Sequence, residues 1–253
     1  MRMTFLGTGT SQGIPVIGST HPVCLSDDPK DTRLRSSVWI EVDGRSWVID
    51  TGPDFRQQML THKVPKLDAI LFTHEHRDHT AGFDDVRPYN FMQKRPMEIY
   101  AQPRVCEALK RDFAYVFAAN RYPGAPSANL HELDGSPFQL DGIEVTPIEV
   151  MHMNLPVLGY RIGDLTYITD AKTITSEEKE KIKGSKVLVL NSLRIEEHYS
   201  HLNLEEALAL VEELKPERAY FTHISHLLGF HREVSAELPE NVYLAYDGLT
   251  VTI

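Results

Sequence analysis

The sequence predicts an α/β (α+β) protein in which two facing sheets carry helices on their outer faces. Three observations indicate this fold class. About ten short segments rich in β-branched and aromatic residues alternate with helical segments. Hairpin-like turns at residues 43–45 (DGR) and 163–165 (GDL) join neighbouring strand candidates, so part of the sheet structure is antiparallel. Roughly ten strands are too many for one open sheet in a chain of 253 residues, which favours two sheets.

The strand and helix candidates follow one another along the whole chain. Strands are expected at residues 36–43, 46–50, 69–74, 97–101, 138–150, 158–164, 165–171, 186–192, 218–223 and 241–253. Helices are expected at Asp54–His62, Pro103–Phe117, Ser176–Lys183, Asn203–Lys215 and His231–Leu238. In the fourth helix Asn203 can cap the first turn, Glu206 lies three residues on, and Pro216 ends the helix. The proline-rich residues 120–134 are expected to form either a surface flap or a plain loop.

The composition indicates one globular domain over residues 1–253, because 42% of the residues are hydrophobic and no linker or repeat divides the chain. The sequence has no long apolar run and no signal-peptide pattern, so we expect a cytoplasmic protein without a membrane partner. Two cysteines are too few for a disulfide framework. A formal net charge of −10 makes nucleic acid an improbable partner and favours a small-molecule substrate. The sequence does not decide the oligomeric state, and a homodimer is one candidate.

The stretch AILFTHEHRDHTAG, residues 69–82, places several metal-binding side chains directly after a strand candidate. In extended backbone, His74 and His76 point to the same side, and Asp78 and His79 follow at the turn into the next element. Nitrogen and carboxylate donors in such a group suit zinc, manganese or iron. The stretch therefore predicts ligands for two neighbouring divalent cations.

Further ligand candidates lie at the ends of other strands. His152, Asp170 and His223 each come just past the carboxyl end of a strand candidate. Side chains from separate strands converge at such an edge, where loops leave room for a substrate. We therefore expect these three residues to complete the metal site.

Together with Asp50 in VIDTG, which comes first in the chain, these motifs resemble, in order, the five motifs of the metallo-β-lactamase superfamily, and the resemblance spans nearly the whole chain. It implies a four-layer αββα sandwich of two mixed sheets with a two-metal centre at one edge. By this resemblance one metal is held by His74, His76 and His152, the other by Asp78, His79 and His223, and Asp170 bridges them. Asp50 in VIDTG would orient ligands by hydrogen bonds, and Asp78 counts among the catalytic residues as well as the ligands.

Two cations that share a water lower its pKa toward neutrality and stabilise charge on the attacked group, so hydrolysis is the expected reaction. A redox branch of the superfamily carries Glu where this chain has His76, which also favours hydrolysis. His201, in SHLNLEEAL between two ligand-bearing strands, lies where phosphodiesterase branches carry a catalytic His. We expect His201 to be a general acid, because the alkoxide leaving group of a phosphate ester needs a proton.

The amino terminus FLGTGTSQGIPVIGSTHPVC, with the later THISH, resembles the PhnP-like cyclic phosphodiesterase branch. That branch holds a structural zinc through three amino-terminal cysteines and a late His. The matching positions here are Ser19, His21, Cys24 and His226, so Ser19 departs from the pattern and His21 replaces sulfur by nitrogen. The alternatives are a zinc site with three protein ligands, one completed by His231 or water, or an abandoned site with a buried thiol.

Arg87 could hold a phosphate or carboxylate, although pairing with Asp84 or Asp85 explains it as well. Cys106 is expected in the core. His62, His131 and His198 belong to no group of candidate functional residues in the sequence and are assigned to the surface or the core.

The sequence thus predicts a phosphodiesterase for a small, cyclic or otherwise modest phosphodiester, with two divalent ions of zinc or manganese, or iron, and one additional structural zinc as a further candidate. Alternatives are a transfer-RNA 3′-end endonuclease or other ribonuclease, a thioester or lactone hydrolase, and a non-catalytic scaffold with a vestigial site. The acidic charge disfavours the first, and the complete ligand set disfavours the last.

Overall fold

A computed structural model describes residues 1–253 and contains two sheets of seven strands each. The first sheet has the order β14 (Thr250–Thr252), β1 (Arg2–Gly7), β2 (Ser37–Val42), β3 (Arg45–Ile49), β4 (Ala69–Leu71), β5 (Met97–Ala101) and β6 (Ala128–Glu132). The second has the order β13 (Val242–Leu244), β12 (Arg218–Thr222), β11 (Val187–Asn191), β10 (Leu165–Tyr167), β9 (Leu155–Ile162), β8 (Ile143–His152) and β7 (Phe138–Leu140). Both sheets mix parallel and antiparallel pairs.

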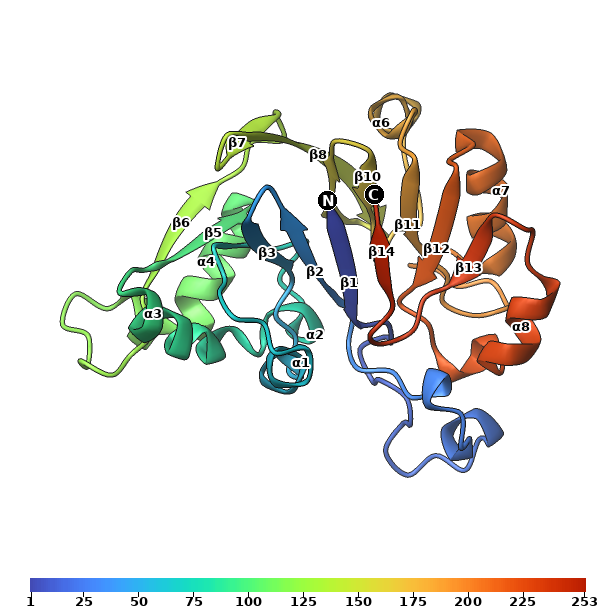
Figure 1. The fold of residues 1–253 in the computed structure, drawn as a ribbon, viewed down its shortest axis with the longest axis horizontal. Helices are drawn as coiled ribbons and strands as arrows, with labels where there is room; N and C mark the ends of the chain where they lie inside the picture. Colours follow the sequence, from blue (N-terminus) through green and yellow to red (C-terminus); the bar gives the residue numbers. More distant parts are fainter.

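The helices are α1 (Phe55–His62), α2 (Arg77–Thr80), α3 (Arg87–Gln93), α4 (Pro103–Asp112), α5 (Ala114–Phe117), α6 (Ser176–Ile182), α7 (Leu204–Leu214) and α8 (His231–Glu237). Helices α1 to α4 gather beside the first sheet and α6 to α8 beside the second (Figure 1). One hydrophobic cluster lies between the first sheet and its helices, and another between the second sheet and its own. The four-layer αββα sandwich is therefore confirmed.

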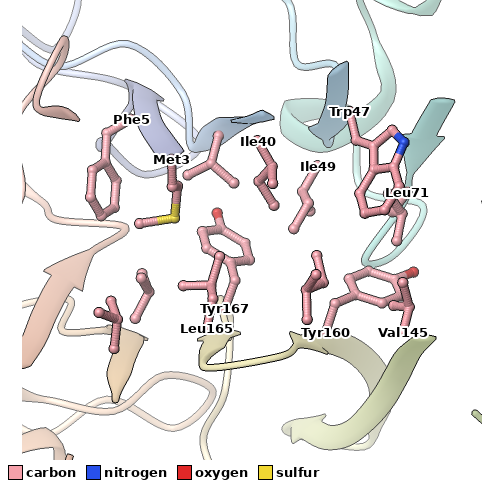
Figure 2. Close-up of a cluster of buried hydrophobic side chains, with 14 of the residues drawn as sticks. Met3, Phe5, Ile40, Trp47, Ile49, Leu71, Val145, Tyr160, Leu165 and Tyr167 are labelled. Carbon is pink, nitrogen blue, oxygen red and sulfur yellow. The ribbon is translucent and has the colours of Figure 1, made fainter. Parts of the chain in front are cut away.

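The alternation of side chains along each strand produces these layers. On β3, Trp47 and Ile49 pack between the two sheets while Val48 faces the helices. On β12, Tyr220 points between the sheets and Phe221 toward the outer helices. Figure 2 shows the inner layer, in which aromatic and aliphatic side chains from both sheets meet. Both faces of the sheets are apolar, as two covered sheets require.

Two contacts fix the sheets to one another close to the HEHRDH stretch. The hydroxyl of Tyr160, on β9, donates a 2.6 Å hydrogen bond to the carbonyl of Phe72. The backbone N–H of Leu158, on the same strand, donates to the carbonyl of Thr73 at 3.0 Å. The second sheet therefore holds the segment that follows β4, and with it the first predicted metal ligands.

The five predicted helices are present, although the one expected over residues 103–117 divides at Phe113 into α4 and α5. Both predicted hairpin turns are present as well. Strands β1 and β6 and the short helices α2 and α3 were not predicted, and β6 forms within the stretch expected to be irregular. The strand expected over residues 138–150 is divided into β7 and β8, and the one expected over residues 241–253 is divided into β13 and β14, which belong to different sheets. β1 lies between β14 and β2, so its place depends on a strand from the opposite end of the chain. None of the helices combines the length and the apolar surface that a membrane span needs.

Candidate metal centre

The seven predicted metal ligands converge from both sheets at one edge of the sandwich. His74 and His76 follow β4, and Asp78 and His79 lie on α2. The others are His152 at the end of β8, Asp170 just after β10 and His223 just after β12. Ring centroids are 4.5 Å apart for His74 and His76, 5.3 Å for His76 and His152, and 5.8 Å for His79 and His223. Residues up to 149 positions apart in the sequence thus share one cluster, as predicted.

Asp170 lies between the two halves of this cluster. One carboxylate oxygen is 3.3 Å from Nε2 of His79, and the other is 3.3 Å from Nε2 of His223. The donor atoms of His74, His79 and Asp170 all lie within 4.8 Å of one another, as do those of Asp78, His79 and His223. This arrangement fits a carboxylate that faces two cations at once.

The histidine nitrogens at the centre make no well-aligned hydrogen bond within the protein, although carboxylates lie close to that of His79. Nε2 of His74 and Nε2 of His79 are buried and accept or donate no hydrogen bond. Buried polar atoms in native proteins normally have a partner, and an unsatisfied one is costly. A divalent cation would be that partner for each nitrogen, so the residues present fit the metals that the motif implies.

The electrostatics of His79 also indicate that the cluster needs positive charge. Burial disfavours the charged form of this ring, but three neighbouring carboxylates outweigh burial and raise the pKa of His79 well above its usual value. These carboxylates belong to Asp78, Asp170 and Asp50. A proton on His79 would compensate their charge in the same place where bound cations would compensate it.

Asp50 orients the ligands from below, as expected. Its carboxylate is fully buried and accepts hydrogen bonds from the backbone N–H and the hydroxyl of Thr73, both at 2.8 Å. Nδ1 of His79 lies 2.7 Å from the same carboxylate, and Nδ1 of His74 lies 3.0 Å from the Thr73 hydroxyl. Each ring is held through Nδ1, so Nε2 is left to face the centre of the cluster.

Three of the site residues adopt left-handed backbone conformations. The φ angles are 64° for Asp50, 58° for Asp170 and 53° for His223. Non-glycine residues rarely take this conformation, and it costs free energy wherever it occurs. The tight turns at these strand ends aim the side chains into the cluster.

His201 lies inside the cluster, although it is not one of the seven ligands. Its ring centroid is 4.5 Å from that of His152 and 5.0 Å from that of His223. Its Nδ1 is 3.8 Å from Oδ1 of Asp170. Burial lowers the pKa of His201 to about 3 against the opposing effect of Asp170, so the ring is neutral at pH 7 in the absence of bound ligands. An anion bound beside the ring would oppose the effect of burial and favour the charged form.

A pocket of about 380 Å³ opens beside these residues. It is lined by His76, His152, Met153, Asn154, Leu155, Tyr199 and Ser200. Nδ1 of His152 donates to the carbonyl of Ser200 at 2.9 Å, which fixes the ring at the base of the pocket. The pocket is therefore the entrance from which a substrate can reach the metal cluster.

The residues considered for a structural zinc lie partly together. The rings of His21 and His226 pack edge to face with centroids 4.9 Å apart. The thiol of Cys24 is buried beside Ile14 and accepts the N–H of Val16 at 3.5 Å. Groups of three or more His, Cys, Asp or Glu donors within 4.8 Å of one another occur only in the cluster around Asp170, and His21, Cys24 and His226 do not form one. A third metal held by these side chains stays a prediction.

The remaining candidates have ordinary partners. Nδ1 of His231, considered as a further zinc ligand, lies 3.1 Å from the buried guanidinium of Arg33. Arg87 binds both carboxylate oxygens of Asp84, at 2.7 and 2.8 Å, and does not line the pocket. Its guanidinium is therefore occupied by the ion pair that the sequence offered as the alternative to substrate binding. Cys106 is in the core, as expected.

Two residues near the site were missed by sequence reasoning. His198, assigned to surface or core, lies 5.2 Å from His201 between ring centroids and stacks on Tyr199. Its closeness in sequence to His201 was the available signal. Arg104, on α4, donates to the carboxylate of Glu75 and to the carbonyl of Pro156. It ties the HEHRDH segment to the β8–β9 hairpin, and no local pattern marks it.

The αββα sandwich with a His/Asp cluster at its edge defines a metal-binding hydrolase fold, and the comparisons agree. The model of the beta-lactamase superfamily domain matches residues 45–224. The solved structure of a diphosphatase from the PhnP family superposes with a TM-score of 0.93 at 38% identity, over 100% of this chain and 97% of that one. The chain therefore belongs to the β-lactamase superfamily, in its PhnP-like branch.

Two sequence relatives carry other names. A Porphyromonas gingivalis protein named octanoyltransferase is 40% identical over 100% of this chain, but the match covers 52% of that protein. A ribonuclease Z from a Mycobacterium species is 24% identical over 72% of this chain and 68% of the relative. The chain thus spans about half the length of the first relative.

Proposed function

We propose that the protein is a dinuclear metal-dependent phosphodiesterase that hydrolyses a small, cyclic or otherwise modest phosphodiester. One observation carries this proposal: His201, a histidine outside the seven ligand positions of the motif, lies 3.8 Å from the carboxylate that faces both halves of the metal cluster and close to the donor atom of His152. Phosphodiester hydrolysis needs a proton donor at this place more than amide or thioester hydrolysis does.

By the order of the motif, the residues that would hold the two cations are His74, His76 and His152 for one, whose rings lie side by side, and Asp78, His79 and His223 for the other, with Asp170 between them. Zinc, manganese and iron all suit this donor set. When bound, two such cations supply a water activated near neutral pH and stabilise charge on the attacked phosphate. Asp50 keeps His79 in the orientation that presents Nε2.

His201 would act on the leaving group. The negative charge of a bound phosphodiester would raise the pKa of the nearby His201 ring, so that the ring takes up a proton and becomes an imidazolium. As the P–O bond breaks, the imidazolium gives this proton to the departing oxygen and returns to the neutral ring, and the alcohol leaves. Burial of the site keeps competing water away from this transfer.

A second candidate is an acyl thioester hydrolase, favoured by the relative named for octanoyl transfer. The match covers about half of that protein, so the transferase activity can reside in the other half. In this reading His201 would be incidental. Transfer-RNA processing, suggested by the ribonuclease Z relative, is disfavoured because a chain of net charge −10 offers few phosphate contacts.

The test is a substrate panel with the purified protein, stripped of metal and then reconstituted with zinc or manganese. The panel contains a cyclic phosphodiester, a linear p-nitrophenyl diester, an octanoyl thioester, a lactone and a precursor transfer RNA. We expect metal-dependent hydrolysis of the diesters, lost in Asp170→Ala. Turnover of the thioester or lactone without the diesters would support the second reading instead.

A further inference from the structure

The β8–β9 hairpin ends in a methionine where the backbone favours other residues. His152 pairs with Leu155, so Met153 and Asn154 form the two-residue turn. Met153 has a φ of 56°, a left-handed conformation that glycine and asparagine adopt far more readily than a long apolar residue. Its side chain is also 54% exposed, so burial in the core does not explain it. An unfavourable conformation and an exposed thioether occur together beside a metal-ligand candidate, which indicates a role in the site.

A second exposed apolar side chain lines the same pocket from another segment. Tyr199 lies in the loop between β11 and α7 and is 73% exposed. Its ring stacks on that of His198, with centroids 4.4 Å apart. Nδ1 of His198 in turn accepts the backbone N–H of Ser200 at 3.3 Å, which fixes the ring below Tyr199. The ring of Tyr199 is therefore packed against His198 on one side and exposed to solvent elsewhere.

The pocket combines two kinds of lining. His76 and His152 supply a polar base that leads to the metal cluster, whereas Met153 and Tyr199 supply apolar surface. Single exposed apolar residues are common on protein surfaces, but two from separate segments on one catalytic pocket mark a ligand contact. Asn154 adds an amide that can both donate and accept hydrogen bonds.

We propose that Met153 and Tyr199 form a specificity-determining rim that binds the base of a nucleoside phosphodiester while the phosphate reaches the metal cluster. This inference rests on the proposed function and names its substrate class. A nucleobase fits because its flat face stacks on tyrosine, its ring contacts a methionine sulfur favourably, and its polar edge suits the Asn154 amide.

The test compares p-nitrophenyl phosphodiesters that share one leaving group and differ in the other alcohol: methanol, octanol or the 5′-hydroxyl of thymidine. The metal-loaded full chain should show a ratio of kcat/KM for the thymidine ester over the methyl ester of about tenfold or more. In Tyr199→Ala that ratio should fall about tenfold, whereas Tyr199→Phe should keep it. Tyr122→Ala is the matched control, because Tyr122 is 76% exposed and lies outside this pocket.

Met153→Gly is a second variant, which removes the side chain from the rim without destabilising the folded protein. Glycine relieves the left-handed backbone, so the melting temperature should not fall, yet the thymidine preference should decrease. In Tyr199→Ala, the ratio of kcat/KM for the octyl ester over the methyl ester could fall while the ratio for the thymidine ester is unchanged. That result would overturn the proposal of a nucleobase and show that the rim binds an alkyl chain. Unchanged ratios in Tyr199→Ala and Met153→Gly would overturn the rim altogether.

Calorimetric binding of thymidine 5′-monophosphate separates this inference from the proposed function. We expect Tyr199→Ala to weaken binding about tenfold relative to wild type and Tyr122→Ala to leave it unchanged. Weakened binding in a protein that hydrolyses none of the diesters would retain the rim and reject the phosphodiesterase. Diester hydrolysis with equal binding by wild type and Tyr199→Ala would retain the phosphodiesterase and reject the rim.

Discussion

Nδ1 of His79 lies 2.7 Å from a carboxylate oxygen of Asp50, and both side chains are fully buried. The pair places the proton of the ring on Nδ1 and leaves Nε2 toward the metal cluster. Because the same carboxylate accepts two hydrogen bonds from Thr73, next to His74, one buried acid orients ligands assigned to both cations. Carboxylates in this position influence metal affinity without touching the metal.

Asp50→Asn should therefore weaken metal binding about 10–100-fold, because the amide keeps the shape but loses the charge that holds the Nδ1 proton. Competition with a chromophoric chelator measures this affinity. Asp84→Asn is the control, since Asp84 pairs with Arg87. Equal metal affinities of wild type and Asp50→Asn would show that the pair has only a packing role.

Arg104 connects the segment that carries His76 with the hairpin that carries His152, through Glu75 and the carbonyl of Pro156. Arg104→Lys keeps the charge but cannot make this forked contact. The affinity for the cation assigned to these histidines should fall about tenfold, while the other cation is held as before. Stepwise zinc titration distinguishes the two. Arg111→Lys, an exposed change on the same helix, should affect neither, and an equal loss at both sites would contradict the assignment.

Asp247 gives the unfolding free energy a specific pH dependence. It accepts hydrogen bonds from Thr8 and the N–H of Leu34, but burial outweighs these bonds and raises the pKa of Asp247 from 3.8 to about 6. A raised pKa means that the folded state holds the proton more tightly than the unfolded state. The stability contributed by this group is therefore fully present below pH 3.8 and is lost as pH rises through about 6.

The comparison with Asp247→Asn isolates this effect, because all other titrating groups are shared. The unfolding free energy of wild type minus that of the variant should decrease by about 2.4 kcal/mol between pH 4 and 7, at 1.36 kcal/mol for each pKa unit and with part of the effect already lost at pH 4. Urea unfolding at several pH values measures both proteins. A difference that is constant or that increases with pH would show that Arg33, the nearby cation, keeps the carboxylate ionised.

The sequence predicted which His and Asp side chains gather at the edge of the sandwich, because its signals are local. His74, His76, Asp78 and His79 lie within six positions, and the remaining ligands each follow a recognisable strand. Strand β1 was missed because its partners β14 and β2 lie far away in the chain, and β6 because its residues are half exposed at the edge of the sheet. Arg104 was missed for the same reason as β1: its partners Glu75 and Pro156 are brought to it by packing alone.

The possible third metal shows where a matching position is insufficient. His21 and His226 do pack together, but the Cys24 thiol accepts a backbone N–H within an apolar cluster. A motif gives the order of donors along the chain, whereas ligation depends on where each donor atom points. In the cluster around Asp170, left-handed backbone at Asp170 and His223 turns these side chains toward the other donors. The sequence did not predict this backbone conformation.

His201 provides the sharpest test of phosphodiester cleavage. His201→Ala should bind both metals as wild type does, since the seven ligand positions of the motif are unchanged. On a diester with an alkyl alcohol as leaving group, turnover should fall about 10²–10⁴-fold, the range expected for a positioned acid. On a p-nitrophenyl diester the loss should be much smaller, because nitrophenolate departs with little need for a proton.

The contrast between these two substrates separates proton donation from damage to the cluster, because disturbed metals would slow both reactions alike. Metal content, measured on the same samples, checks that His201→Ala retains both ions. His201 is 3.8 Å from the carboxylate of Asp170, so a small rearrangement of that carboxylate is the main competing explanation. Asp170 would then bind metal less well in the variant, and the two substrates would lose equal activity. Such equal losses would remove His201 from the mechanism and favour the acyl hydrolase, in which no proton donor is needed at this position.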